Sequence, residues 1–118
     1  MPEFLYQNKL YYHSVEFALD RIGGTWKMPV LWRLKRKSMR FGEIKKDIPR
    51  ISDKVLSSQL KMLEKDGFIT RKVFAEVPVR VEYSLTARGK RAIKIITSMR
   101  NYGTQLMKEY KIKIPKNK

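Results

Sequence analysis

The chain has 118 residues, of which 42% are hydrophobic and 32% are charged, a composition that supports one folded domain and excludes a disordered tail. It contains no cysteine, which excludes disulfides, thiol chemistry and cysteine metal sites. It also contains no apolar run that is long enough to span a bilayer. The formal net charge is +16, from 27 Lys and Arg against 11 Asp and Glu. Such an excess attracts polyanions, of which nucleic acid is the commonest. The alternative partner is an anionic lipid surface, for which the sequence offers no separate amphipathic helix.

The N-terminal residues predict a cytoplasmic location for the protein. They are followed by two predicted helices. Residues 1–10 lack the charged and then apolar pattern of a secretory signal. The first helix has an apolar stripe at i, i+3, i+4 and i+7, formed by Val15, Ala18, Leu19 and Ile22. Gly23 and Gly24 end it, and Thr25 is suited to cap a second helix over residues 26–37.

Two further helices with a short connection occupy residues 40–67. The shorter one begins near Arg40 and ends before Pro49, and the longer one is capped by Ser52 and closed by Gly67. Two helices joined in this way are typical of a helix-turn-helix.

After Gly67 the apolar period changes from helical to alternating. Residues 79–85 predict a strand with one buried face, and Phe68–Phe74 is its expected partner, so residues 68–85 form a β-hairpin wing. Thr86 caps a last helix of about six turns over residues 87–110, and residues 111–118 form a basic tail. The fold class is mostly α with a β-hairpin wing, a winged helix-turn-helix.

The fourth helix has a leucine stripe on one side and only lysines and serines on the other. At about 100° per residue, Leu56, Leu60 and Leu63 share the buried side. Lysine binds phosphate or guanine, and serine bonds to either phosphate or a base edge. The expected DNA-binding residues of this recognition helix and its start are Arg50, Ser52, Lys54, Ser57, Ser58, Lys61 and Lys65.

The wing and its surroundings supply further cations for the DNA backbone or minor groove. These are Arg40, Arg71, Lys72 and Arg80. The alternative is that the polar residues of the fourth helix and the cations of the wing are ordinary solvated side chains. The order of the helix-turn-helix elements and the overall charge favour the interpretation that they bind DNA.

The apolar stripe of the last helix is longer than a small core can cover, and the first helix has an apolar side of its own. We therefore expect residues 11–24 and 87–110 to form a two-fold dimer interface. The expected contacts are Tyr11, Tyr12, Phe17, Ile95, Met99, Tyr102 and Leu106. The alternative is a last helix that folds back entirely on its own domain.

These residues resemble the HxlR family of bacterial winged-helix regulators. The segments that carry the resemblance are 15–19, 22–26, 40–44, 51–56, Leu60, 63–64, 66–67, 77–86 and Gly89. The resemblance implies a homodimer whose terminal helices pair, with residues 52–65 in the major groove, and control of a nearby gene. The family often has a cysteine and a proline before the Val-Glu pair. This chain has His13 and Ser14 there, so thiol sensing is excluded.

The residues show no catalytic constellation, metal site or cofactor motif. His13 is the only histidine, and no spacing supplies the partners that a general base or a metal ligand needs, so we expect a packing or capping role. Glu43, Asp47, Glu64 and Asp66 are expected as helix-surface acids. A small-molecule effector site between the dimer helices stays open.

The sequence thus predicts a homodimeric, sequence-specific regulator that binds double-stranded DNA at an inverted repeat. The alternative from a different class is an architectural protein that binds nucleic acid through charge alone, with a steep salt dependence. An enzyme acting on an anionic substrate is a third hypothesis, which no residue spacing supports.

Overall fold

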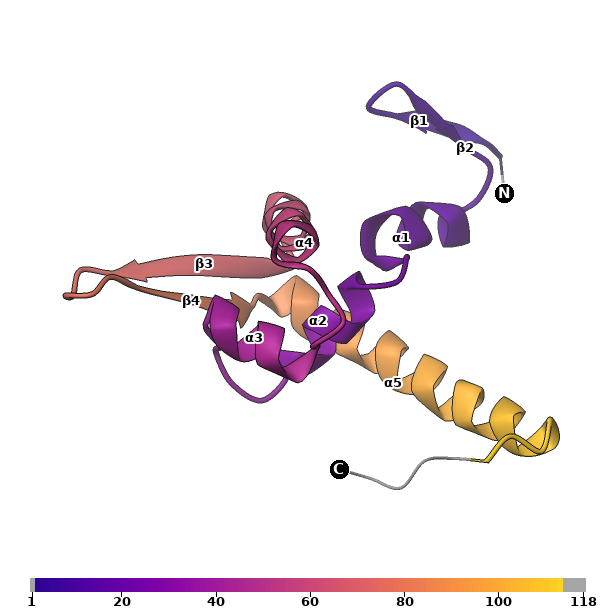
Figure 1. Ribbon diagram of the computed structural model, residues 1–118. Coiled ribbons are helices and arrows are strands. Elements are labelled where there is room, and N and C mark those ends of the chain that lie inside the picture. Colours follow the sequence, from indigo (N-terminus) through magenta and orange to yellow (C-terminus); the bar gives the residue numbers. More distant parts are fainter. Residues whose placement is uncertain (1, 114–118) are drawn as a thin grey trace.

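The computed structural model describes residues 2–113, over which the chain forms five helices and two β-hairpins (Figure 1). The expected basic tail therefore lies mostly outside the described residues. The elements in chain order are β1 (Phe4–Tyr6), β2 (Lys9–Tyr11), α1 (Ser14–Ile22), α2 (Lys27–Arg33), α3 (Phe41–Asp47), α4 (Asp53–Lys65), β3 (Ile69–Phe74), β4 (Arg80–Leu85) and α5 (Ala87–Glu109).

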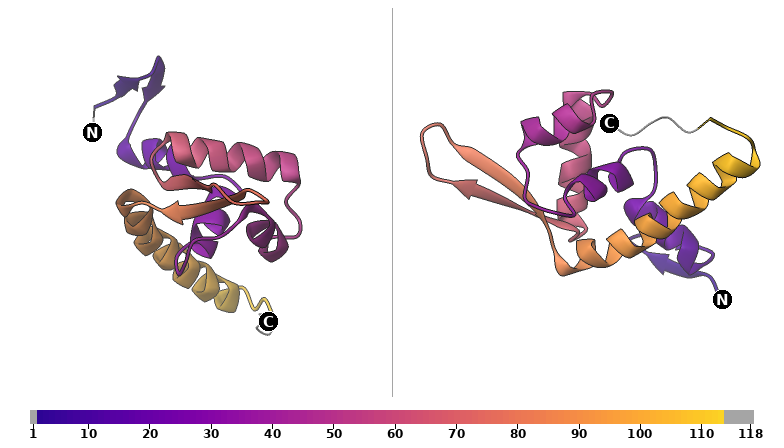
Figure 2. Two further views of the ribbon diagram at one scale, coloured as in Figure 1. Left: turned by 90° about the vertical axis from the view of Figure 1, so that its left-hand side faces the viewer. Right: turned by 90° about the horizontal axis from the view of Figure 1, so that it is seen from below.

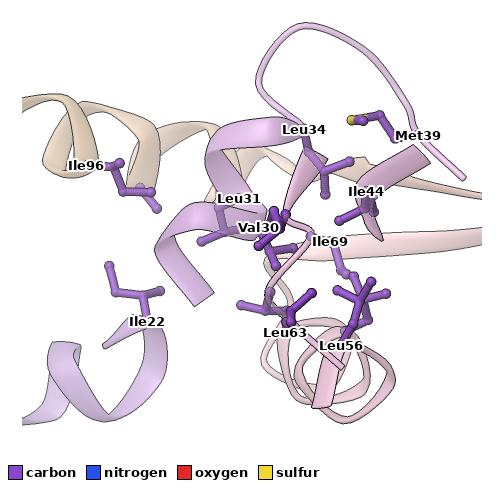
Figure 3. Packing of buried hydrophobic residues seen from close by; sticks show 14 residues of the cluster. Ile22, Val30, Leu31, Leu34, Met39, Ile44, Leu56, Leu63, Ile69 and Ile96 are labelled. Carbon is purple, nitrogen blue, oxygen red and sulfur yellow. The ribbon is translucent and has the colours of Figure 1, made fainter. Parts of the chain in front are cut away.

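The core lies between α2, α3, α4, the base of the wing and the first half of α5. Figure 3 shows Leu56 and Leu63 of α4 directed toward Val30 and Leu31 of α2 and toward Ile69 of β3. All five side chains are at most 2% exposed. Full burial of such a side chain contributes about 1.5–3 kcal/mol, so the leucine stripe anchors the back of α4 firmly.

Two predicted helix starts, at Ser52 and Thr86, are confirmed by their capping bonds, and His13 caps a third helix. Ser52 Oγ accepts from the N–H of Val55 at 3.1 Å, and Thr86 Oγ1 accepts from the N–H of Gly89 at 3.1 Å. His13 Nδ1 accepts from the N–H of Glu16 at 3.1 Å, which is the capping role expected for it. Each bond satisfies one of the N–H groups that the first turn of a helix leaves free.

The predicted second helix is wrong at both ends. Its N-cap is Trp26, which makes no side-chain capping bond, and the helix ends at Arg33 rather than at residue 37. The N–H of Leu34 bonds to the carbonyl of Leu31 at 3.1 Å, which tightens the last turn. The chain must then become extended, because Met39 exchanges two backbone hydrogen bonds with Tyr83 of the wing, at 2.8 and 3.0 Å.

The predicted wing is present as the antiparallel pair β3 and β4, with Ile69 opposite Leu85 and Phe74 opposite Arg80. Figures 1 and 2 show that it projects from the body of the domain, away from α5. The expectation of one buried face is wrong for its outer half, where Val73 and Val79 are 52% and 65% exposed. Among residues 2–113, no other helix or strand covers the tip of the hairpin (Figure 1).

The N-terminal hairpin β1–β2 was not predicted. Its turn consists of Gln7 and Asn8, both with positive φ, at 50° and 65°. Two-residue turns of this kind usually contain glycine, which is the signal that the sequence lacks here. The expected helical segment 11–24 therefore begins with a strand residue, since Tyr11 belongs to β2 and α1 starts at Ser14.

Candidate nucleic-acid interface

The outer face of α4 carries the predicted DNA-binding side chains. Ser52, Lys54, Ser58, Lys61 and Lys65 are exposed, and Ser57 is half-buried. The N-terminal approach to the helix is held by Ile51, which is 1% exposed, while its neighbour Arg50 is exposed. The turn after α3 therefore leaves one basic side chain and the capped start of α4 exposed.

A hollow of about 320 Å³ joins α4 to the wing. Its lining residues are Ser57, Lys61, Glu64, Arg71 and Tyr83. Two predicted residues of the helix and one of the wing are thus brought together. Sequence reasoning missed Tyr83 as a member of this surface, because the alternating pattern of β4 assigned it to the buried side. Glu64 is exposed, as expected for a helix-surface acid.

Three of the four other predicted cations are exposed. Arg71 and Lys72 project from β3, and Arg40 precedes α3, where its backbone N–H donates to Glu43 Oε1 at 2.8 Å. Lys72 Nζ lies 5.0 Å from the centre of the Phe74 ring.

Arg80, the fourth predicted cation, is paired within the wing. Its Nη2 is 3.0 Å from Glu76 Oε2, and its Nε is 3.5 Å from Glu82 Oε2. The guanidinium also lies 3.9 Å from the centre of the Phe74 ring, across the hairpin. Arg80 therefore stabilises the outer part of the wing, because its guanidinium pairs with acids and with an aromatic ring of the hairpin itself.

The remaining cations of this surface are not neutralised by neighbouring acids. Over residues 2–113, the ion pairs involve only Lys9, Arg21 and Arg80 among the basic side chains. The lysines of α4 and Arg71, which lines the hollow beside them, therefore keep a positive field over this surface, while Lys72 lies on the other face of the hairpin. In the same residues, no three His, Cys, Asp or Glu side chains form a group that could hold a metal ion.

A second exposed surface is apolar and belongs to α1 and α5. Val15 and Leu19 of α1 are 61% and 53% exposed, and Ile95, Met99 and Tyr102 of α5 are 52%, 52% and 59% exposed. Between the two helices lies a groove of about 290 Å³ whose walls include Ala18, Ile22 and Ala92. The C-terminal part of α5 projects from the body of the domain (Figures 1 and 2).

The structure places the expected dimer contacts unequally. Tyr12 is exposed, and Leu106 and Phe17 are half-buried. Tyr11 needs a correction, because it is 1% exposed. Its ring lies 5.4 Å from that of Phe4 and 5.1 Å from that of Phe17, and its hydroxyl donates to Asp20. Tyr11 therefore holds the N-terminal hairpin on α1 and does not present a surface.

Within the part of the chain that the structure covers, no helix has both the length and the hydropathy to cross a membrane. The long helix α5 has several basic residues along its length. Its apolar positions occupy a stripe, as in a helix that packs against protein.

Comparison with known proteins identifies the family of this chain. The HxlR-like helix-turn-helix family model matches residues 21–111. An HTH-type transcriptional regulator of Methanothermobacter thermautotrophicus is 46% identical over 93 residues, which are 79% of this chain and 71% of that protein.

Solved structures support the same assignment to a helix-turn-helix family. The HTH-type transcriptional regulator YtcD has a TM-score of 0.77 at 36% identity, over 81% of this chain and 98% of its own. The oxidized form of the redox regulator HypR has a TM-score of 0.74 at 40% identity, over 77% of this chain and 94% of its own. The chain therefore belongs to the HxlR-like helix-turn-helix family of DNA-binding transcriptional regulators, and its fold is the winged helix of that family.

Proposed function

We propose that this protein is a sequence-specific regulator that binds an inverted-repeat operator as a homodimer. The observation that carries the proposal is the two-sided character of α4. Its leucines are at most 1% exposed, while Lys54, Ser58 and Lys61 are exposed. Neither lysine makes an ion pair in residues 2–113. The helix is therefore fixed by its back and free to enter the major groove.

Each group of side chains has a distinct role in this proposal. The lysines and serines of α4 contact base edges and nearby phosphates. Arg40, Arg50 and Ser52 contact the phosphate backbone at the start of the helix-turn-helix, and Lys65 contacts the backbone at its end. Arg71 and Lys72 contact the backbone beside the adjacent minor groove.

The occupant of the apolar face of α1 and α5 is a second copy of this chain. Five large apolar side chains there are more than half exposed, and α5 extends beyond the core that could cover it. An isologous contact covers the same face on both copies, which is how most homodimers form. Tyr12, Ile95, Met99, Tyr102 and Leu106 are the proposed contacts, and Phe17 borders them.

A two-fold dimer determines the form of the operator. Its two α4 helices enter major grooves about 34 Å apart on one side of the duplex, so the half-sites are inverted repeats. The DNA target also places the site of action in the compartment that holds the genome.

The test is a genome-wide binding map followed by affinity measurements on the best site and on random duplex at about 150 mM salt. We expect a specific-to-random ratio of roughly 10³ or more. Lys61→Ala should change the base preference, whereas Lys94→Ala, an exposed lysine of α5, should not. Equal affinity for all duplexes would contradict the proposal and support the architectural alternative.

A further inference from the structure

We propose that the cavity between the N-terminal hairpin and the end of α4 binds a small aromatic carboxylate, and that this ligand changes operator affinity. The first half stands on the cavity alone, and only the second half rests on the proposed function. The cavity has a volume of about 420 Å³. That volume lies in the range of sites that bury a small molecule.

Five parts of the chain meet at this cavity. Tyr6 and Gln7 come from the hairpin, Phe17 and Arg21 from α1, and Lys65 from the end of α4. Asp66 and Phe68 follow α4, and Arg88 lies in the first turn of α5. A site built from so many elements depends on how they pack and is more than a crevice in a single loop.

The walls contain three aromatic rings, from Tyr6, Phe17 and Phe68. The rings of Tyr6 and Phe17 are already in edge-to-face contact, with centroids 5.4 Å apart. Aromatic rings attract a planar ring through further edge or offset contacts beyond the area that they bury. The walls therefore favour a ligand with an aromatic body.

The charges favour an anionic group on that body. Arg21, Lys65 and Arg88 line the cavity, and Asp66 is its only acid, so three positive charges meet one negative charge. Arg21 Nη1 lies 3.8 Å from Asp66 Oδ1, a long contact that leaves the guanidinium accessible to another acceptor. Lys65 makes no ion pair in residues 2–113.

The two arginines are held in position by other contacts. The guanidinium of Arg21 lies 4.6 Å from the centre of the Phe17 ring and 5.1 Å from that of Tyr6. Arg88 Nη1 donates to the carbonyl oxygen of Asp66 at 2.7 Å. A guanidinium has five N–H donors, so each arginine keeps donors for a carboxylate, which it can bind through two of them.

The cavity connects the recognition helix with both helices of the proposed dimer interface. A carboxylate that replaces Asp66 as the partner of Arg21 would break the ion pair that joins α1 to the end of α4. The position of α4 relative to the partner's α4 would change in consequence, and operator affinity with it. The hairpin, with Tyr6 and Gln7, lies before the residues that the family model matches.

The direct test is an NMR titration of the full-length protein with benzoate. We expect saturable shifts at Tyr6, Gln7 and Phe68, with a Kd of about 1 mM or tighter. Benzamide tests the charge and cyclohexanecarboxylate tests the ring. Each should bind roughly tenfold more weakly than benzoate, since each lacks one of the two recognition elements.

Variants of the lining cations distinguish benzoate binding in this cavity from non-specific attraction by the positive charge of the whole protein. Arg88→Gln should weaken benzoate binding about tenfold, the loss of one charge-assisted hydrogen bond. Lys65→Gln serves the same purpose without touching a packed side chain, because Lys65 is exposed. Lys90→Gln removes the same charge from α5 outside this cavity and should leave benzoate binding unchanged.

Three results would overturn the inference. Equal binding of benzamide would remove the role of the cations, and shifts confined to the groove at Ile95 would place the ligand elsewhere. The absence of saturable shifts would remove the site. If benzoate binds here but leaves operator affinity unchanged, the regulatory half fails, while the proposed function stands on the operator measurement itself.

Discussion

Thr86 Oγ1 donates a hydrogen bond of 2.6 Å to the carbonyl oxygen of Gly67. Thr86 Oγ1 also accepts from the N–H of Gly89, so this one hydroxyl group joins the end of the recognition helix to the start of α5. Gly89 is itself required at this junction, because a Cβ there would lie 2.2 Å from the carbonyl oxygen of Phe68. The angle at which the wing and the two helices meet is therefore set by a few backbone contacts.

Loss of this hydroxyl should lower stability. Thr86→Val keeps the shape but removes both the helix cap and the bond to Gly67, so we expect about 1–2 kcal/mol less free energy of unfolding. The measurement is equilibrium denaturation in urea. Thr97→Val is the matched control, since its hydroxyl bonds to a helix carbonyl on an exposed face and should contribute less than about 0.5 kcal/mol. Equal losses in the two variants would mean that the hydrogen bonds of Thr86 contribute no more to the free energy of unfolding than an exposed helix hydroxyl does.

The wing allows a direct comparison of two cations. Lys72 is exposed, whereas Arg80 is paired with Glu76 and Glu82. Lys72→Ala should reduce the slope of log affinity against log salt by about 1, because one phosphate contact is lost. Arg80→Ala should leave that slope nearly unchanged. A drop of similar size for Arg80 would show that its ion pairs open when DNA binds.

The dimer interface can be tested with a buried charge. Met99→Glu places a carboxylate twice into the proposed two-fold contact, so the dimer dissociation constant should rise about a hundredfold or more. Asn101→Glu adds the same charge on the opposite, exposed side of α5 and is the control. Sedimentation equilibrium measures both. If both variants sediment as the unmodified protein does, this face is not the interface.

The N-terminal hairpin should respond to acid through one hydrogen bond. The Tyr11 hydroxyl donates to the Asp20 carboxylate, which lowers the pKa of that carboxyl below its ordinary value of 3.8 and raises the pKa of Tyr11. A lowered pKa in the folded state contributes stability above about pH 3.8 that is lost as the pH falls through the folded-state pKa.

The unmodified protein should therefore exceed Tyr11→Phe in stability by a constant amount near neutral pH, and the difference should shrink below about pH 3.8. Hydrogen exchange of the hairpin amides and urea denaturation both report it. Tyr12→Phe alters an exposed hydroxyl and should show no such difference. A Tyr11→Phe difference that persists unchanged in acid would rule out the Asp20 bond as its source.

Local chemistry let the sequence predict most of the fold. Ser52 and Thr86 begin helices because their hydroxyls bond to N–H groups only three residues away, and Gly67 ends α4 because its φ of +81° suits glycine. The leucine stripe of α4 follows from helical period alone, and its burial is confirmed. Such features depend on neighbours within one or two turns, so the order of residues is enough to determine them.

Contacts between distant segments decided the rest. The charge of Arg80 was visible in the sequence, but its ion pair with Glu82 and its contact with Phe74 depend on hairpin geometry. The end of α2 depends on backbone bonds between Met39 and Tyr83, which are 44 residues apart. Tyr11 was visible as an aromatic residue, and only the packing of the hairpin on α1 buries it. Burial and charge pairing are properties of the assembled surface, because they depend on what the rest of the chain brings to each side chain.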